Sequence, residues 1–318
     1  MNETAPPRSG GRAQGGRAMT TPQQTTIAFI GLGIMGAPMA GHLIDAGYDV
    51  VGFNRSRPAV DRLVERGGRA AQSVAEAVRD ADVVITMVPD SPDVEGLAFA
   101  EEGIYASAKP GTLYIDCSTI RPDVARRVAA AGADRGIRVV DAPVSGGEAG
   151  AKEGSLSIMV GGEAEDVEAA RPYLDVVGAT VVHVGPPAAG QTVKAANQLI
   201  VAGNIQLLAE ALVFLEAHGV DTESATTVLG GGLAGSAVLN RKAAGMRARE
   251  FAPGFRIDLH HKDLGIVTAA AREAGVAIPL GAHVAQLVGA LRAQGHGGLD
   301  HSALLLLVEQ LSGRDQRD

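Results

Sequence analysis

Residues 190–218 read GQTVKAANQLIVAGNIQLLAEALVFLEAH, and no proline interrupts them. Small and apolar residues recur there at the spacing of one helix face, namely at Val193, Ala196, Leu199, Ile200, Gly203, Leu207, Ala211, Leu212 and Leu215. The opposite side is also mostly small or apolar, so we expect one helix that is covered on most of its circumference. At about 1.5 Å per residue it would be about 40 Å long, and Gly219 follows at the usual stop position.

Lys194 lies near the start of this predicted helix, and Asn197, three residues on, would share its face. The chain has 28 basic residues, of which only five are lysines: Lys109, Lys152, Lys194, Lys242 and Lys262. Arginine keeps its proton in proteins, whereas a desolvated lysine can release it. Lys194 is therefore either a candidate acid–base group or a lysine whose ammonium extends from a helix end into solvent.

The length and composition limit the class of protein. A chain of 318 residues suggests about two domains, and 46% hydrophobic residues support a substantial core. The net charge of −8 argues against nucleic acid or a membrane surface as the main partner. The single cysteine, Cys117, excludes an internal disulfide and a cysteine-based zinc site. We find no run of about 18 apolar residues that suggests a spanning helix, and expect a cytoplasmic protein.

Residues 1–24 are rich in Gly, Pro, Arg and Gln and lack the apolar core of a secretory signal. We expect a disordered tail there, with Met19 as an alternative start, and a second short tail at 313–318.

A nucleotide-binding pattern follows the first tail. The segment 26–30 (TIAFI) predicts a buried strand, and 49–53 (DVVGF) predicts a second strand after an amphipathic helix. Between them lies G-x-G-x-x-G, which favours a dinucleotide site because its glycines permit a tight turn and close approach of the pyrophosphate. The predicted phosphate-binding residues are Gly31, Leu32, Gly33, Ile34, Met35 and Gly36.

The residues that end the second strand bear on the choice of cofactor. NAD sites usually place a carboxylate there, but this chain has Asn54, Arg55 and Ser56. Arg55 would attract a 2′-phosphate, so we expect NADPH to be preferred and NADH to be accepted. The alternative is that Arg55 and Arg57 are ordinary surface residues.

Strands predicted at 83–88, 113–115 and 138–140 alternate with helices at 71–80 and 122–132. Alternation of this kind is typical of an α/β fold, a Rossmann-type doubly wound parallel sheet. Ligands bind such sheets beyond the carboxyl ends of the strands. The residues expected there, at the edge of the cofactor, are Val88, Pro89, Ser118 and Thr119.

Residues 141–162 contain six glycines. The turn formed by Ser145, Gly146 and Gly147 offers a hydroxyl and unhindered backbone N–H groups, which can cradle a carboxylate. The same composition is also compatible with a mobile surface loop.

Residues 221–312 predict helices with short breaks and no strands. These helices cannot easily enclose the apolar 190–218 helix, so we expect a homodimer or homotetramer. The eight histidines show no metal-binding spacing, and the adjacent His260 and His261 would project differently from a helix. We therefore expect no metal site.

Four blocks in this order, FIGLGIMGAPMAGHL, DAPVSGGEAGAKEG, GQTVKAANQ and HKDLGI, resemble the β-hydroxyacid dehydrogenase family across about residues 25–312. The resemblance implies a dinucleotide-binding domain (25–187) and an all-helical domain for substrate binding and oligomerisation (188–312), joined by a long interdomain helix. It implies a small 3-hydroxy or 3-oxo acid as substrate and Lys194 as the catalytic residue. It also implies substrate contacts from Ser145, Gly146, Gly147 and Asn197, with Lys262 beside the cofactor or simply paired with Asp263.

Three further stretches, LAGSAVLNRKAAGM, PGFRIDLHHKDLG and LDHSALL, resemble the branch of this family that reduces 2-hydroxy-3-oxopropionate (tartronate semialdehyde) to D-glycerate. In that reaction protonated Lys194 would give its proton to the carbonyl oxygen that receives charge. Two alternatives remain: the same chemistry on 3-hydroxyisobutyrate, succinic semialdehyde or glyoxylate, and an NADP-binding sensor without turnover.

Overall fold

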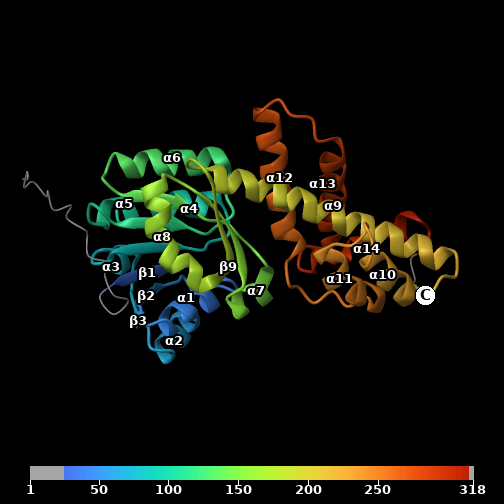
Figure 1. Ribbon diagram of the computed structural model, residues 1–318, viewed down its shortest axis with the longest axis horizontal. Helices are drawn as coiled ribbons and strands as arrows, with labels where there is room; N and C mark the ends of the chain where they lie inside the picture. Colours follow the sequence, from blue (N-terminus) through green and yellow to red (C-terminus); the bar gives the residue numbers. More distant parts are fainter. Residues whose placement is uncertain (1–24, 315–318) are drawn as a thin grey trace, which may run out of the picture.

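The computed structural model describes residues 25–314 and consists of a sheet domain and a helical domain with one long helix, α9, running from the first across the second (Figure 1). The predicted tail at 1–24 and the last four residues of the predicted tail at 313–318 lie outside the described residues.

Six strands of the sheet are parallel, in the order β3-β2-β1-β4-β5-β6. Their bounds are β1 Thr26–Ile30, β2 Asp49–Phe53, β3 Arg69–Ala70, β4 Val83–Thr86, β5 Leu113–Asp116 and β6 Arg138–Asp141. Ile27 and Phe29 of β1 belong to one core cluster and Ala28 and Ile30 to another. Because successive side chains of a strand point to opposite faces, both faces of the sheet are covered.

The helices of this domain are α1 Gly36–Asp45, α2 Arg57–Glu65, α3 Val74–Val78, α4 Ser91–Phe99, α5 Ile104–Ser107, α6 Pro122–Ala133, α7 Gly147–Glu153 and α8 Ala164–Val177. The Rossmann-type arrangement predicted from the alternation is confirmed. The helix predicted at 71–80 is shorter than expected, because its first turn is a capping turn at Ser73, whose side chain accepts a hydrogen bond from the Glu76 N–H. Helices α2, α4, α5, α7 and α8 were not predicted.

The glycine-rich segment 141–162 is not a simple surface loop. It forms β7 (Val144–Ser145), helix α7 and β8 (Leu156–Gly161). β8 is antiparallel to both β6 and β7, and β9 (Gly178–Gly185) is parallel to β8. The sheet is therefore mixed at this edge, beside the start of α9.

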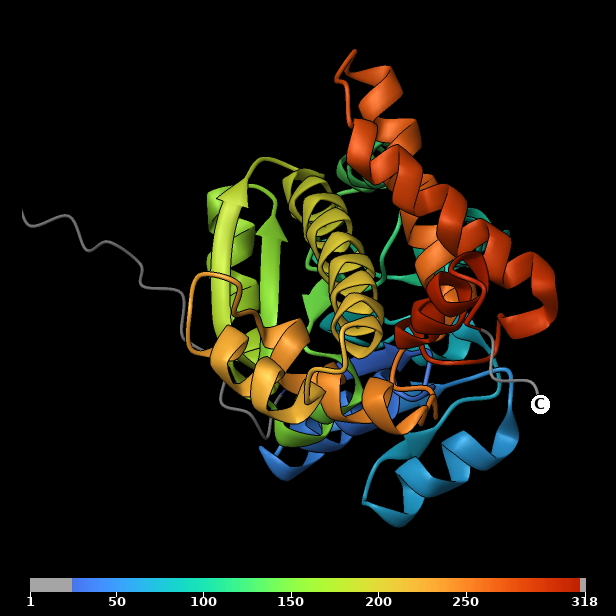
Figure 2. The ribbon, with the colours of Figure 1, turned by 90° about the vertical axis from the view of Figure 1, so that its right-hand side faces the viewer.

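The second domain is helical, as predicted. Its elements are α10 Thr222–Gly230, α11 Ala237–Ala248, α12 Ile257–Glu273, α13 Pro279–Leu291, η2 Arg292–His296, η3 His301–Ala303 and α14 Leu304–Leu311. Helices α11, α12, α13 and α14 contact α9 and share a core cluster with it. Both ribbon views show α12 and α13 projecting beyond the rest of the domain as a pair (Figures 1 and 2).

Helix α9 spans Ala189–Ala217, 29 residues, close to the predicted bounds, and Gly219 follows it with a φ of 69°. Its amino-terminal end is held by the buried carboxylate of Asp141, which accepts hydrogen bonds from the Ala188 N–H (2.7 Å) and the Gln191 N–H (2.9 Å). Ala188 has a φ of 76°, a left-handed conformation that is costly for a residue with a Cβ atom.

The expectation that α9 is covered on most of its circumference is wrong for a single chain. Several residues of the predicted apolar face point outward: Val193, Ile200, Leu207 and, at the same spacing, Phe214 are 37%, 62%, 54% and 63% exposed. The side that packs inward carries three buried glutamines as well as apolar residues. Tertiary packing, rather than hydrophobicity alone, decides which side of this helix faces the core.

By length and composition α9 is long and apolar enough to cross a membrane. The expectation that no such stretch exists is therefore wrong. A core helix of a soluble protein passes the same test, and the buried polar side chains and covering helices of α9 are those of a core helix.

Candidate active site

Lys194 lies on the first turns of α9 and is only 6% exposed, so its ammonium does not extend into solvent. Its Nζ donates a hydrogen bond of 2.8 Å to the carbonyl oxygen of Val144, the first residue of β7. Burial lowers the pKa of Lys194 to about 8, while the negative charge of Asp263 opposes this effect and the positive charge of Lys262 adds to it. The lysine is thus poised to exchange a proton near neutral pH.

Two residues of α12 provide the charges around this lysine. Asp263 is 2% exposed, and its Oδ2 accepts a hydrogen bond of 2.5 Å from the side chain of Gln198. Lys262 forms the predicted ion pair with Asp263, at 2.8 Å, and also donates to the carbonyl oxygen of Thr119 at 2.7 Å. The second bond joins the helical domain to the sheet domain. Whether Lys262 also lies beside the cofactor stays a prediction.

The predicted substrate residues come together from two domains. Ser145 ends β7, and its Oγ donates to Oδ1 of Asn197 on α9 at 3.4 Å. Gly146 and Gly147 follow with φ values of 141° and 65°, a turn that leads directly into α7. This turn lies next to the lysine, because Val144, which accepts the Lys194 hydrogen bond, immediately precedes Ser145.

The three glycines of the G-x-G-x-x-G turn between β1 and α1 have different surroundings. A Cβ atom on Gly31, which has a φ of 98°, would lie 2.3 Å from the Met87 carbonyl oxygen, and one on Gly36 would lie 1.9 Å from the Gly31 carbonyl oxygen. Beside Gly33 a Cβ atom would meet nothing within 4 Å. The first and third glycines thus permit close packing, and the second leaves an open approach at the start of α1, where helical N–H groups are free for phosphate.

The other residues of this turn fit the same purpose. The side chain of Ile34 is 63% exposed at the open approach, and Met35 is the last residue before α1. The Leu32 N–H donates to Oδ1 of Asn54 at 3.0 Å, so the residue after β2 holds the turn in place. These residues fit a dinucleotide, with the pyrophosphate at the start of α1.

Arg55 lies just beyond β2, with its side chain 82% exposed and its guanidinium 3.7 Å from the Asp93 carboxylate. Ser56 is the N-cap residue of α2. The position of Arg55 leaves it free to meet a 2′-phosphate, but the cofactor preference drawn from it stays a prediction.

The residues expected at the carboxyl ends of the strands lie together. Val88 and Pro89 follow β4, and Ser118 and Thr119 follow its neighbour β5. The Val88 N–H donates to the Ser118 hydroxyl at 3.0 Å, which ties the two strand ends to each other. β4 also pairs with β1, so this edge adjoins the glycine turn.

Two buried glutamines on α9 were missed. Gln191 accepts from the Ile120 N–H (3.0 Å) and donates to the Ser118 carbonyl oxygen (2.7 Å), which fixes α9 to the sheet. Gln198 bonds to Asp263, as described above. Gln191, Lys194 and Gln198 lie at i, i+3 and i+7 on one helix face. A polar face on an otherwise apolar helix could therefore have predicted both glutamines as buried contacts.

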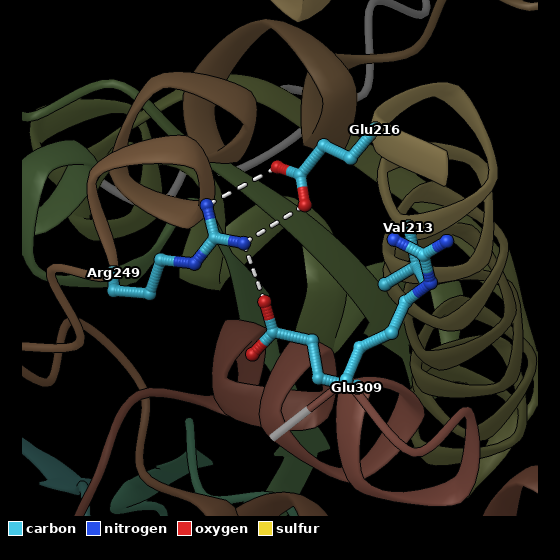
Figure 3. A pocket seen from close by; sticks show the side chains of 5 residues that line it. Val213, Glu216, Arg249 and Glu309 are labelled. Carbon is cyan, nitrogen blue, oxygen red and sulfur yellow. Dashed lines mark hydrogen bonds and ion pairs between the residues drawn. The ribbon is translucent and has the colours of Figure 1, made fainter. Parts of the chain in front are cut away.

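Two hollows of the structure lie away from these residues. One, of about 380 Å³, is shown in Figure 3, where Arg249 bonds to both Glu216 and Glu309. The other, of about 400 Å³, lies between α12 and α13. Neither contains Lys194 or the glycine turn, and in the first the charge of Arg249 is paired with those of Glu216 and Glu309. Within residues 25–314, no group of three or more His, Cys, Asp or Glu side chains could hold a metal ion.

Comparison with known proteins assigns this architecture. Residues 26–185 match the family model of the NAD-binding domain of 6-phosphogluconate dehydrogenase. Residues 188–308 match the family model described as NAD-binding of NADP-dependent 3-hydroxyisobutyrate dehydrogenase. Together the two matches cover both domains, and they show that the chain binds a nicotinamide dinucleotide.

Curated relatives match over nearly their whole length. The NAD-dependent L-serine dehydrogenase of Pseudomonas aeruginosa is 41% identical over 91% of this chain and 99% of its own. The 2-hydroxy-3-oxopropionate reductase of Escherichia coli is 38% identical over 90% and 98%. The structure of Mycobacterium tuberculosis 3-hydroxyisobutyrate dehydrogenase with L-serine has a TM-score of 0.82 and 37% identity over 88% and 98%. The chain therefore belongs to the β-hydroxyacid dehydrogenase family of NAD(P)-dependent oxidoreductases.

Proposed function

We propose that this enzyme reduces 2-hydroxy-3-oxopropionate to D-glycerate, reversibly, with NADPH preferred over NADH. The observation that carries the proposed chemistry is a buried lysine beside a serine–glycine turn and an asparagine amide. The choice of substrate is supported by the 38% identical relative of that name and by the three sequence stretches that resemble its branch.

In this proposal the chain's own groups divide the work. Ser145 and the N–H groups of Gly146 and Gly147 bind the substrate carboxylate, and Asn197 binds the 2-hydroxyl or the carbonyl oxygen. The bound nicotinamide supplies or takes the hydride. Lys194 stabilises the charge on the carbonyl oxygen and donates its proton there.

The lysine also sets the expected dependence on pH. Reduction needs the protonated ammonium, so kcat/KM for reduction should fall as the pH rises through about 8. Oxidation needs the neutral amine, so its kcat/KM should rise through the same pH. If the two directions changed in the same sense, Lys194 would not be the proton donor.

A second candidate substrate is L-serine. The relative named NAD-dependent L-serine dehydrogenase is 41% identical to this chain. L-Serine and glycerate carry the same carboxylate and 3-hydroxyl and differ in the group on the middle carbon, so the same turn and lysine would serve both.

The proposed enzyme is a cytoplasmic homodimer or homotetramer. The exposed apolar side of α9, formed by Val193, Ile200, Leu207 and Phe214, supports an association with a second copy. Changing Leu207 to Glu should shift the mass measured by light scattering towards the monomer. An unchanged mass would mean that α9 is not at the interface.

The substrate is tested by following the nicotinamide at 340 nm. Reduction of tartronate semialdehyde, succinic semialdehyde, glyoxylate and methylmalonate semialdehyde is compared with oxidation of D-glycerate and L-serine. A kcat/KM clearly highest for the tartronate semialdehyde and D-glycerate pair supports the proposal, and a preference for L-serine favours the second candidate. No turnover despite tight NADPH binding would favour the sensor.

A further inference from the structure

Behind the candidate active site lies a chain of buried polar side chains that the proposed chemistry does not use. It begins at Gln198 on α9, whose backbone carbonyl oxygen meets the ring of His260 on α12, and it ends at His301 on η3, whose ring meets that of His260. The three residues are 5%, 0% and 7% exposed. Buried polar groups are costly unless their hydrogen bonds are made, so the bonds of this group define it.

The side chain of Gln198 links the Asp263 carboxylate on α12 to the Asn197 amide on α9. Its amide NH₂ donates to Oδ2 of Asp263 at 2.5 Å, and its carbonyl Oε1 accepts from the Asn197 side chain at 2.8 Å. Gln198 also lies one turn after Lys194 on the same face of α9. One amide therefore holds both the carboxylate that acts on the lysine and the amide proposed to touch the substrate.

His260 contacts the backbone of Gln198, and His301 holds the ring of His260. His260 Nε2 lies 3.4 Å from the Gln198 carbonyl oxygen, which can only accept, so Nε2 carries the proton. His260 Nδ1 is then an acceptor when the ring is neutral. His301 Nδ1, 3.0 Å away, must be the donor.

The surroundings favour this neutral, ordered pair. Burial lowers the pKa of His260 and of His301, and the His260 ring lowers that of His301 further. The charged groups that act on the pair are Lys194, Lys242, Asp263 and Asp300. Asp300 is itself held by two hydrogen bonds from the Lys242 ammonium, at 2.8 and 2.9 Å, which fixes its charge beside His301.

We propose that Gln198, held by the buried pair His260–His301, is a positioning residue that fixes the Asp263 carboxylate toward Lys194 and the Asn197 amide toward the substrate. The proposal rests on the roles of Lys194 and Asn197 proposed above. It assigns a function in the active site to residues of η3 and α12 that do not touch the substrate.

The chain allows a test that does not depend on turnover. With only five lysines, the NMR spectrum of the protein labelled at lysine ¹³Cε contains few signals, and the one missing in Lys194→Arg identifies Lys194. In Gln198→Met the Asp263 carboxylate loses the donor to its Oδ2 and keeps only the Lys262 ammonium at its Oδ1, so it can turn towards Lys262 and away from Lys194. An opposite charge nearby is worth about 1–3 in pKa, so we expect the measured pKa of Lys194 to fall by about 0.5 or more.

Two matched comparisons separate positioning from general stability. Gln206 is a glutamine of the same helix, also 5% exposed, that bonds to Glu210 instead, so Gln206→Met should leave the pKa of Lys194 unchanged. His301→Asn keeps a donor where Nδ1 stands and should resemble the wild type, whereas His301→Leu should lower the pKa of Lys194 as Gln198→Met does.

Each outcome bears on the proposal. A fall in the pKa in Gln198→Met and His301→Leu, with rescue in His301→Asn, supports it. An unchanged pKa in folded Gln198→Met protein overturns it, even if kcat falls. Because the titration reads the lysine directly, a wrong choice of substrate leaves this result intact, and loss of the proposed function would appear only in the turnover assays.

Discussion

The proposed cofactor side and the proposed substrate side of the candidate site are built from different parts of the polypeptide. The cofactor side is mainly backbone, in which Gly31 and Gly36 are needed for close packing and Gly33 is open. The proposed substrate side adds to its own glycine turn a set of buried polar side chains, centred on Lys194 and Asp263. Binding at a backbone site tolerates little steric change and depends weakly on pH. Activity at a site of buried charges depends on pH, and burial of those charges lowers the free energy of unfolding. Each of the following experiments affects one side and should spare the other.

The largest effect is expected at the lysine. Lys194→Ala should lower kcat by on the order of 10² or more while the Kd for NADPH stays nearly unchanged, because the proton donor is lost and the glycine turn is intact. Lys194→Arg keeps the charge but cannot release a proton, so it should be nearly as inactive. Stopped-flow kinetics and fluorescence titration of NADPH measure the two quantities. Near-normal turnover in either variant would remove Lys194 from the mechanism.

Lys194 should also reduce the stability of the fold. A pKa lowered from 10.5 to about 8 corresponds to a loss of about 3 kcal/mol in the free energy of unfolding. The loss is complete below pH 8, where Lys194 is protonated in both the folded and the unfolded state. Between pH 8 and 10.5 only the unfolded state holds the proton, so the stability contributed at this site rises with pH. Lys194→Met should therefore be more stable than the wild type by about 1–3 kcal/mol at pH 7, and by less at pH 9.5.

Urea unfolding followed by circular dichroism measures this difference, since the chain has no tryptophan. Lys194→Arg serves as the control, because its charge remains at both pH values. If the difference in the free energy of unfolding between Lys194→Met and the wild type does not shrink as the pH rises, the lysine is not buried as a cation.

The open glycine tests the cofactor side alone. Gly33→Ala should leave the unfolding midpoint unchanged, because its Cβ atom meets nothing within 4 Å. It should nevertheless raise the Kd for NADPH about tenfold or more, because the pyrophosphate must approach the backbone there. Gly298→Ala, equally unhindered but in the helical domain, is the control. Equal affinity of Gly33→Ala and wild type would place the phosphates elsewhere.

A smaller effect is expected at Arg55. Arg55→Ala should lower the ratio of kcat/KM with NADPH to that with NADH about fivefold, because an exposed guanidinium contributes modestly. Asp93→Asn removes the nearby carboxylate and should move the same ratio the other way. If neither variant changes the ratio, the preference for NADPH does not come from this arginine.

The same comparison explains which features of the structure could be predicted from the sequence. The glycine turn, five of the six parallel strands and the bounds of α9 follow from local spacing, and they are found at or close to the predicted positions. The outward direction of Ile200 and Leu207 could not be read, because hydrophobic spacing does not show which side other helices cover. The hydrogen bond from Gln198 to Asp263 joins residues 65 positions apart in sequence, so only the folded chain brings them together.

The left-handed residue Ala188, which directly precedes α9, has a consequence for how this enzyme can change over generations. Its left-handed backbone conformation costs about 1 kcal/mol relative to glycine, and alanine codons differ from glycine codons at one base. A library of single-base mutants selected for activity after heating should therefore yield Ala188→Gly among its first stabilised clones. Its absence would indicate that the alanine methyl group, which is 2% exposed, contributes more through packing than the strain removes.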